Sequence, residues 1–255
     1  MTKKPTNRDA DPVTRSLNRR GFLKTAGAGA AVGALPFTLP ANAWATAAQN
    51  DAEAATNGDT EANEPAGYLF FNVEEIPFIE AAVDVLIPHD DVGPGALELG
   101  VNTYIDRQMH GAYGRGYRLY LQGPFEQGTP EQGWQLALTP AQLIRLGIAN
   151  VQTYAQDNHG SHFEDLSTEQ QVAVFEAVET GQAILSDVPA QIFFNELLQL
   201  TVEGYFADPL YRGNKGKAAW DMLGFPGLPA MYRNKIAKYR NKPYQAQAKS
   251  IQDFI

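Results

Sequence analysis

The chain has 255 residues, 44% of them hydrophobic, a formal net charge of −9 and no cysteine. Without cysteine, the chain itself can form no disulfide, thiolate metal site or covalent haem link. Residues 1–43 hold seven of the 20 Lys and Arg but two of the 29 Asp and Glu, so the remainder has a net charge of −14. This charge excludes a nucleic-acid or anionic-lipid binder driven by counterion release.

A twin-arginine motif lies near the N-terminus, where Arg19 and Arg20 are followed by Phe22 and Leu23. Such a pair is an address read by a receptor, and these four residues are the predicted export signal. The run 25–39 is too short and rich in Gly for a membrane span, which needs about 20 apolar residues. Small residues offer a cleavage site near 43 or 45. We therefore predict a signal peptide over 1–45 and folded export to the periplasm.

A linker and one domain are predicted after the signal. Residues 46–67 are small, polar and acidic, without an apolar stripe, which indicates a flexible linker. Order is expected to begin near Tyr68. The 188 residues of 68–255 suffice for one domain with a sizeable core.

The first part of this domain predicts two helices and a long loop. Asn72, with Glu75 three places on, has an N-cap pattern, and apolar residues follow at helical spacing until Pro88. A shorter helix is predicted over 101–109. Residues 111–138 are rich in Gly and Pro and have no sustained period, so they are expected to form an ordered excursion. Loops of that length are usually functional or partner-facing.

Three further helices have clear start signals. Thr139 precedes a proline and opens a long helix, and Ser167 begins a capping box whose helix closes at Gly181. A third helix follows Pro189 and is apolar almost all round as far as Phe206, which predicts burial within the domain or between two chains. Short pieces are expected at 217–223 and 230–239. Alternating strand patterns are scarce, so the predicted fold is mainly α, a single irregular helical domain with long ordered loops.

Recognisable catalytic and cofactor motifs are absent from the sequence. It has no Gly-x-Gly-x-x-Gly after a strand, no Walker loop and no Cys-x-x-Cys-His, so we assign no catalytic, cofactor-binding or metal-binding residue. Among the histidines, His110 at a helix end favours a structural role. His89 precedes two aspartates, and His159 and His162 are three apart. A self-sufficient secreted enzyme or metal-binding protein that uses these loops is therefore an open alternative.

Motifs along most of 68–255 resemble the small subunit (subunit 3, gamma) family of gluconate 2-dehydrogenase. They include Phe-Asn-Val-Glu-Glu at 71–75, Ala-Ala-Val-Asp-Val-Leu-Ile-Pro-His-Asp at 81–90 and Tyr-Ile-Asp-Arg-Gln at 104–108. The most specific are Thr-Val-Glu-Gly-Tyr-Phe-Ala-Asp-Pro at 201–209, Gly-Asn-Lys at 213–215 and Gly-Phe-Pro-Gly at 224–227.

The resemblance implies an accessory role in an oxidoreductase complex. In that family the small subunit carries the twin-arginine signal and accompanies a flavoprotein of the glucose–methanol–choline family. FAD is then expected in the partner and no cofactor in this chain. A multihaem cytochrome c, with haem c, is often a third subunit, and would place the complex at the inner membrane. The family supplies no catalytic residue that can be assigned here.

A partner interface is predicted between residues 203 and 229. This segment holds Tyr205, Phe206, Tyr211, Trp220 and Phe225 among five Gly and three Pro. Aromatic side chains on a fixed irregular path are typical interface anchors. The alternative for Trp220 and Phe225 is that they close the core of the domain itself.

Overall fold

The computed structural model describes residues 67–126, 128–228 and 231–255. The predicted export residues Arg19, Arg20, Phe22 and Leu23, the cleavage site and linker positions 46–66 lie outside these ranges. Within them, no helix combines the length and the apolar character that a membrane crossing requires.

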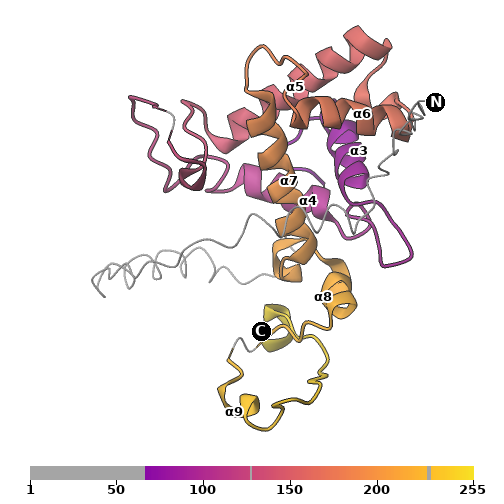
Figure 1. Cartoon of the computed structure of the whole chain (residues 1–255), viewed down its shortest axis with the longest axis vertical. Helices are drawn as coiled ribbons and strands as arrows, with labels where there is room; N and C mark the ends of the chain where they lie inside the picture. The colour runs from indigo at the N-terminus through magenta and orange to yellow at the C-terminus, as the bar shows by residue number, and fades with distance from the viewer. Residues whose placement is uncertain (1–66, 127, 229–230) are drawn as a thin grey trace, which may run out of the picture. The chain divides into compact units, whose positions relative to one another are not determined.

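The described residues form seven α-helices and no β-strand, which confirms the mainly α prediction (Figure 1). The helices are α3 Ile76–Leu86, α4 Val101–His110, α5 Pro140–His159, α6 Thr168–Glu179, α7 Ala190–Phe206, α8 Ala218–Leu223 and α9 Arg233–Ile236. Between α4 and α5, the predicted excursion 111–138 contains turns and one short 3-10 helix, Pro130–Gln132.

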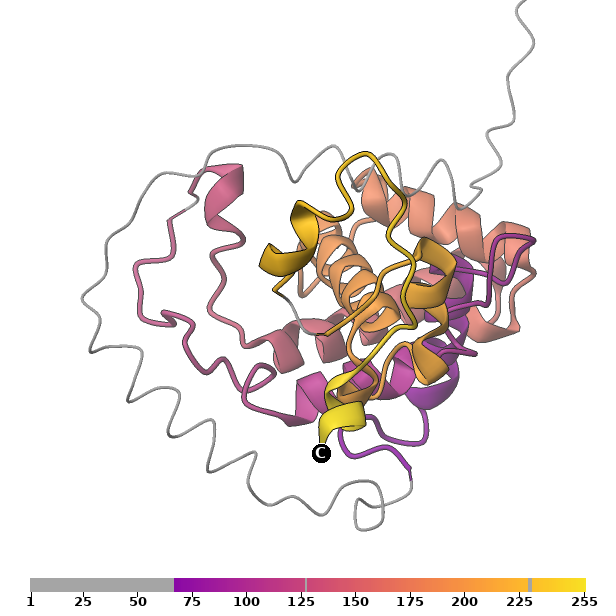
Figure 2. The same cartoon turned by 90° about the horizontal axis from the view of Figure 1, so that it is seen from below.

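Helix α7 lies at the centre of the domain. It contacts α3, α4, α5, α6 and α8, and Figures 1 and 2 show α3, α4, α5 and α6 around it. Phe193, Leu197 and Leu200 on α7 are almost completely buried. The nearly uniform apolar character of this helix is therefore explained by burial within its own domain.

Local capping decides where the helices begin. Thr139 caps α5, as predicted, and the structure adds a capping box between it and Gln142. Ser167 and Gln170 form the predicted capping box at α6. At α3 the predicted start is three residues early. The Asn72 side chain accepts from the backbone N–H groups of residues 74 and 75, which makes a separate turn, and the helix begins at Ile76.

Two glycines let α7 approach its neighbours closely. A Cβ atom on Gly147 of α5 would lie 1.9 Å from Cδ2 of Phe193, and one on Gly204 of α7 would lie 2.6 Å from Cδ1 of Tyr104. Neither distance leaves room for a methyl group, because real Cβ atoms do not come so close to ring carbons. Gly204 belongs to the 201–209 motif, so this motif includes a helix-crossing residue.

A buried carboxylate fixes the start of the domain. Asp106 on α4 is fully buried and accepts hydrogen bonds from the backbone N–H groups of residues 69, 70 and 71, at 2.7, 2.8 and 3.0 Å. Its other partner is the Arg107 guanidinium, at 2.5 Å. Buried carboxylates require such partners, so Asp106 binds the entering chain to α4.

Candidate functional site

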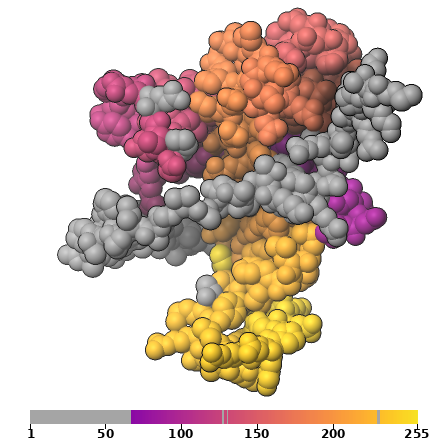
Figure 3. Space-filling model, viewed as in Figure 1, coloured from indigo at the N-terminus to yellow at the C-terminus, as the bar shows by residue number. Residues whose placement is uncertain are grey.

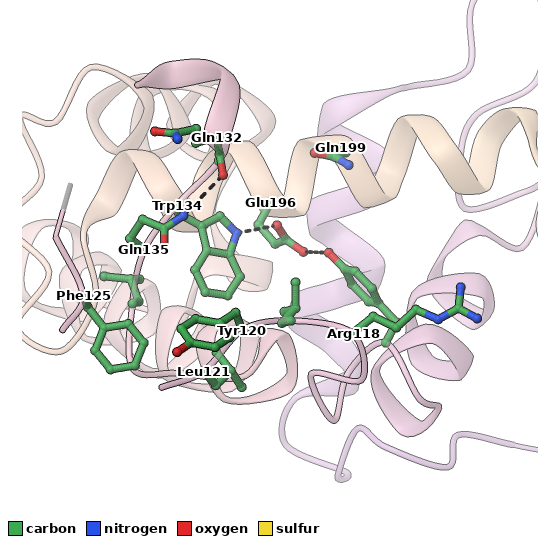
Figure 4. A pocket seen from close by; sticks show the side chains of 13 residues that line it. Arg118, Tyr120, Leu121, Phe125, Gln132, Trp134, Gln135, Glu196 and Gln199 are labelled. Atoms are coloured by element: carbon green, nitrogen blue, oxygen red, sulfur yellow. Dashed lines mark hydrogen bonds between the residues drawn. The ribbon is translucent and has the colours of Figure 1, made fainter. Parts of the chain in front are cut away.

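The excursion 111–138 is attached to α7 through one buried carboxylate. Glu196 on α7 is 5% exposed, and the Tyr113 hydroxyl donates to its Oε1. Trp134 Nε1 donates to Oε2 of the same carboxylate at 3.1 Å. Figure 4 shows the indole of Trp134 turned toward Glu196 and joined to it by this hydrogen bond. Since Tyr113 lies near the start of the excursion and Trp134 near its end, Glu196 holds both ends.

The protonation of this cluster suits a structural role. Burial, the hydrogen bond to Glu196 and the negative charge of that carboxylate all raise the pKa of Tyr113 above its usual range. The phenol therefore stays protonated at physiological pH and remains a hydrogen-bond donor. A permanently protonated phenol cannot act as a general base.

A cavity of about 380 Å³ opens beside this cluster. Its lining combines aromatic rings with amide side chains, which Figure 4 shows around the opening. The amides of Gln132, Gln135 and Gln199 are engaged, since they bond respectively to Thr129 N, to a backbone carbonyl and to Glu203. These amides support the loop and the helix, so the geometry assigns the cavity no reaction.

Large apolar side chains on the excursion are exposed, and Leu119, Tyr120 and Phe125 among them also line the open cavity. The exposed fractions are 62% for Tyr117, 42% for Leu119, 79% for Tyr120 and 36% for Phe125. In Figures 1 and 3 the excursion stands out from the neighbouring helices. Exposed aromatics gathered on a loop held at both ends are typical of a protein-binding surface. We refer to residues 117–125 as the aromatic arm.

Comparison with protein families identifies the domain. The family described as gluconate 2-dehydrogenase subunit 3 matches residues 73–227, more than half of the 255 residues. The chain belongs to this family. A second match, the TAT (twin-arginine translocation) pathway signal sequence, covers residues 16–36 and confirms the predicted export signal. Comparisons with curated proteins and with solved structures found no match.

The subunit 3 domain places the five predicted interface residues in two different environments. Tyr205 and Trp220 are buried, with 1% and 7% exposure, and form part of the core. Phe206 is half-buried, while Tyr211 and Phe225 are 52% and 45% exposed. Phe206, Tyr211 and Phe225 can contact a partner without rearrangement of the domain. Their role in an interface stays a prediction.

Trp220 closes the end of α7. Its Nε1 donates to the carbonyl of Phe206 at 2.8 Å, and its ring meets that of Phe225 edge to face at 5.3 Å. Tyr205 donates to the carbonyl of Pro94 at 2.9 Å. These contacts favour the alternative reading, in which Trp220 completes the core of the domain.

All four histidines of the chain are exposed. His89 Nδ1 is 3.2 Å from Glu98 Oε2 on the surface, and His159 and His162 are both exposed. Within the described ranges, no three His, Cys, Asp or Glu side chains gather as a metal site would require. His110 ends α4, as expected. The alternative built on these loops therefore gains no support from their geometry.

Sequence reasoning missed Tyr113, Trp134 and Glu196. The hydrogen bonds from the two aromatic residues to the carboxylate span 83 and 62 positions, so no local pattern connects the three. One signal was present. A single carboxylate on the buried face of an otherwise apolar helix predicts partners that bring hydrogen-bond donors to it.

Proposed function

We propose that this chain is the non-catalytic small subunit of a periplasmic, flavin-dependent dehydrogenase complex that acts on sugars or sugar acids. It stabilises a glucose–methanol–choline family flavoprotein and carries it through the twin-arginine pathway. FAD belongs to that partner. A cytochrome subunit with haem c receives the electrons and holds the complex at the inner membrane.

One observation carries this proposal: an export signal and a subunit 3 domain occur in the same chain. The twin-arginine pathway accepts folded proteins, so a subunit with this signal can take an assembled partner across. The aromatic arm supports the proposal because it offers exposed rings to a protein surface.

Loss of the twin-arginine pair tests co-export. We expect the double variant Arg19→Lys and Arg20→Lys to retain both this chain and its flavoprotein in the cytoplasm, because lysine keeps the charge but lacks the planar guanidinium. Fractionation followed by immunoblotting measures both proteins. The matched control is Lys3→Arg with Lys4→Arg, which lies in the same segment and should leave export intact. Normal periplasmic flavoprotein in the double variant would show that the partner travels independently.

The aromatic arm provides a second test, of partner binding. We expect Tyr120→Ala with Phe125→Ala to weaken co-purification of the flavoprotein about tenfold or more, since exposed aromatic anchors supply much of an interface's affinity. The control is Val73→Ala with Ile184→Ala, which removes two side chains that are 83% and 89% exposed elsewhere. Equal losses from both pairs would contradict a specific role for the arm.

A further inference from the structure

Positive charge gathers at the C-terminal end of this acidic protein. Residues 207–255 hold nine Lys or Arg and three Asp or Glu, a net charge of +6, whereas residues 67–206 hold four and nineteen, a net charge of −15. The average charge of the chain hides this separation. The net charge of the chain as a whole argues against binding to anionic surfaces. That argument does not apply to residues 207–255, because this segment is basic.

The basic residues lie on a closed loop. Leu228 N donates to the carbonyl of Lys249 at 2.8 Å, and Lys249 N donates to that of Pro226 at 3.2 Å. We call the described residues 228 and 231–249 the basic loop, which is drawn in yellow in Figures 1 and 2. Gly227, at φ +65°, permits this closure, because a Cβ there would lie 2.1 Å from the Lys249 carbonyl oxygen.

Three tyrosine rings pack against one another within the loop. Tyr232 and Tyr239 both meet Tyr244 edge to face, at 5.8 and 4.8 Å between ring centroids. The Tyr232 hydroxyl donates to the carbonyl of Gly227 at 2.7 Å, and the Lys235 ammonium lies 4.8 Å from the Tyr244 ring centre. The loop therefore presents its charges from a defined framework.

The outer surface of the loop is both basic and apolar. No Asp or Glu occurs between positions 222 and 252. Across the described part of the chain, none of the loop's basic side chains is paired with a carboxylate. Met231 and Ile236 are 77% and 68% exposed. The exposed basic residues are Arg233, Lys235, Lys238, Arg240, Lys242 and Lys249.

This composition is that of a segment at a lipid–water interface. Clusters of four to eight Lys and Arg bind anionic headgroups, tyrosines favour the headgroup level, and apolar side chains enter the acyl boundary. At physiological ionic strength, exposed charges are screened beyond about 8 Å, so an acidic helical region does not prevent a local basic contact. The subunit 3 match ends at residue 227, where the loop begins, so the loop is additional to the part recognised as a dehydrogenase subunit.

We propose that the basic loop binds the surface of an anionic phospholipid bilayer. Its Lys and Arg side chains contact lipid phosphates, and Met231 and Ile236 enter the headgroup region beside them. The contact is peripheral and adds to any attachment that a cytochrome subunit provides. It also orients the protein, because the acidic helices are repelled by the same surface.

Vesicle binding tests the proposal on the exported full chain purified from the periplasm. We expect sedimentation with phosphatidylcholine vesicles that contain about one third phosphatidylglycerol, none with phosphatidylcholine alone, and release at about 0.5 M salt. The double variant Arg233→Glu and Lys238→Glu should bind about tenfold more weakly or worse. The matched control, Arg115→Glu and Lys215→Glu, changes the net charge equally outside both the basic loop and the aromatic arm and should stay within about twofold of the parent.

Three results would overturn the proposal. They are equal binding to both kinds of vesicle, a loop variant that binds like the parent, and a control that loses as much binding as the loop variant. Co-purification of the flavoprotein is measured in parallel. If the loop variant loses the flavoprotein while vesicle binding persists, the loop is a protein contact. If it retains the flavoprotein but loses the vesicles, both this inference and the accessory-subunit proposal stand.

Discussion

Glu196 shows how one side chain can hold a long loop. The Glu196 carboxylate is buried and accepts from two half-buried aromatic donors, so both hydrogen bonds are lost if it is removed. A buried hydrogen-bond donor without an acceptor lowers the free energy of unfolding by the desolvation free energy of that group. Removing Glu196 therefore breaks two attachments of the excursion to α7 at once.

We expect Glu196→Ala to lower the free energy of unfolding by about 2–4 kcal/mol, because the Tyr113 hydroxyl and the Trp134 indole N–H both lose their acceptor. Urea unfolding measures this, and the near-ultraviolet circular dichroism of Trp134 reports on the loop. Glu176→Ala on the exposed face of α6 is the control and should change stability by less than about 0.5 kcal/mol. Similar losses from both variants would show that Glu196 is not an anchor.

Three tyrosines, of which Tyr104 is buried and Tyr68 and Tyr113 are half-buried, predict a loss of stability at alkaline pH. Burial is the main cause that raises the pKa of Tyr68, Tyr104 and Tyr113, and nearby glutamates add to it. In the unfolded chain a tyrosine has its ordinary pKa of about 10, which is lower than its raised pKa in the folded protein. The folded protein therefore has its full stability below about pH 10. As pH rises above this value the unfolded chain loses its proton first, and the free energy of unfolding falls.

Above about pH 10, the melting temperature of the parent protein should therefore fall more steeply with pH than that of the variants Tyr104→Phe and Tyr113→Phe. Calorimetry between about pH 8 and 11 measures this slope. Tyr117→Phe is the control, because this ring is 62% exposed. An unchanged slope in both test variants would contradict the prediction.

At the scale of elements, the close packing of α5 against α7 requires glycine at position 147, where a side chain would overlap the Phe193 ring. We expect Gly147→Ala to destabilise the domain by about 1–3 kcal/mol or more, because the new methyl group overlaps the Phe193 ring. Thr153→Ala on the exposed face of α5 is the control and should stay within about 0.5 kcal/mol of the parent. Thermal unfolding of both variants measures the difference, and a stable Gly147→Ala protein would show that the crossing can relax.

The end of α7 gives another element-scale prediction. Trp220→Ala should lower stability by about 3–5 kcal/mol, because a buried indole and its hydrogen bond to Phe206 are lost together. Phe225→Ala, in the half-exposed neighbouring ring, should cost less. Circular dichroism melting of the isolated chain distinguishes them. An unchanged melting temperature for Trp220→Ala, with loss of the flavoprotein, would return Trp220 to the interface.

The elements were predictable where their signals are local. A glutamine follows three positions after both Thr139 and Ser167, so the sequence alone predicts where both helices begin. Asn72 has the same pattern but forms a separate turn, since its helix follows only at Ile76. The close contacts at Gly147 and Gly204 depend on which helices pack together. Local sequence signals do not show this packing, so these contacts could not be predicted.

For the molecule as a whole, sequence reasoning found the family and the signal but not the surfaces. It placed Trp220 among the interface anchors because an aromatic on an irregular path resembles an exposed one until its neighbours are known. It treated charge as one total, which concealed the difference between residues 67–206 and 207–255. Glu196 was missed because its partners arrive from the distant excursion.

The contact of Asp106 with the backbone of residues 69–71 has a consequence for the order of folding. These residues lie 35–37 positions from their acceptor, so they become fixed only when α4 has formed and turned its carboxylate inward. Resistance to limited proteolysis at positions 69–71 should therefore appear only after α4 has folded, and would report that this end of the domain is complete.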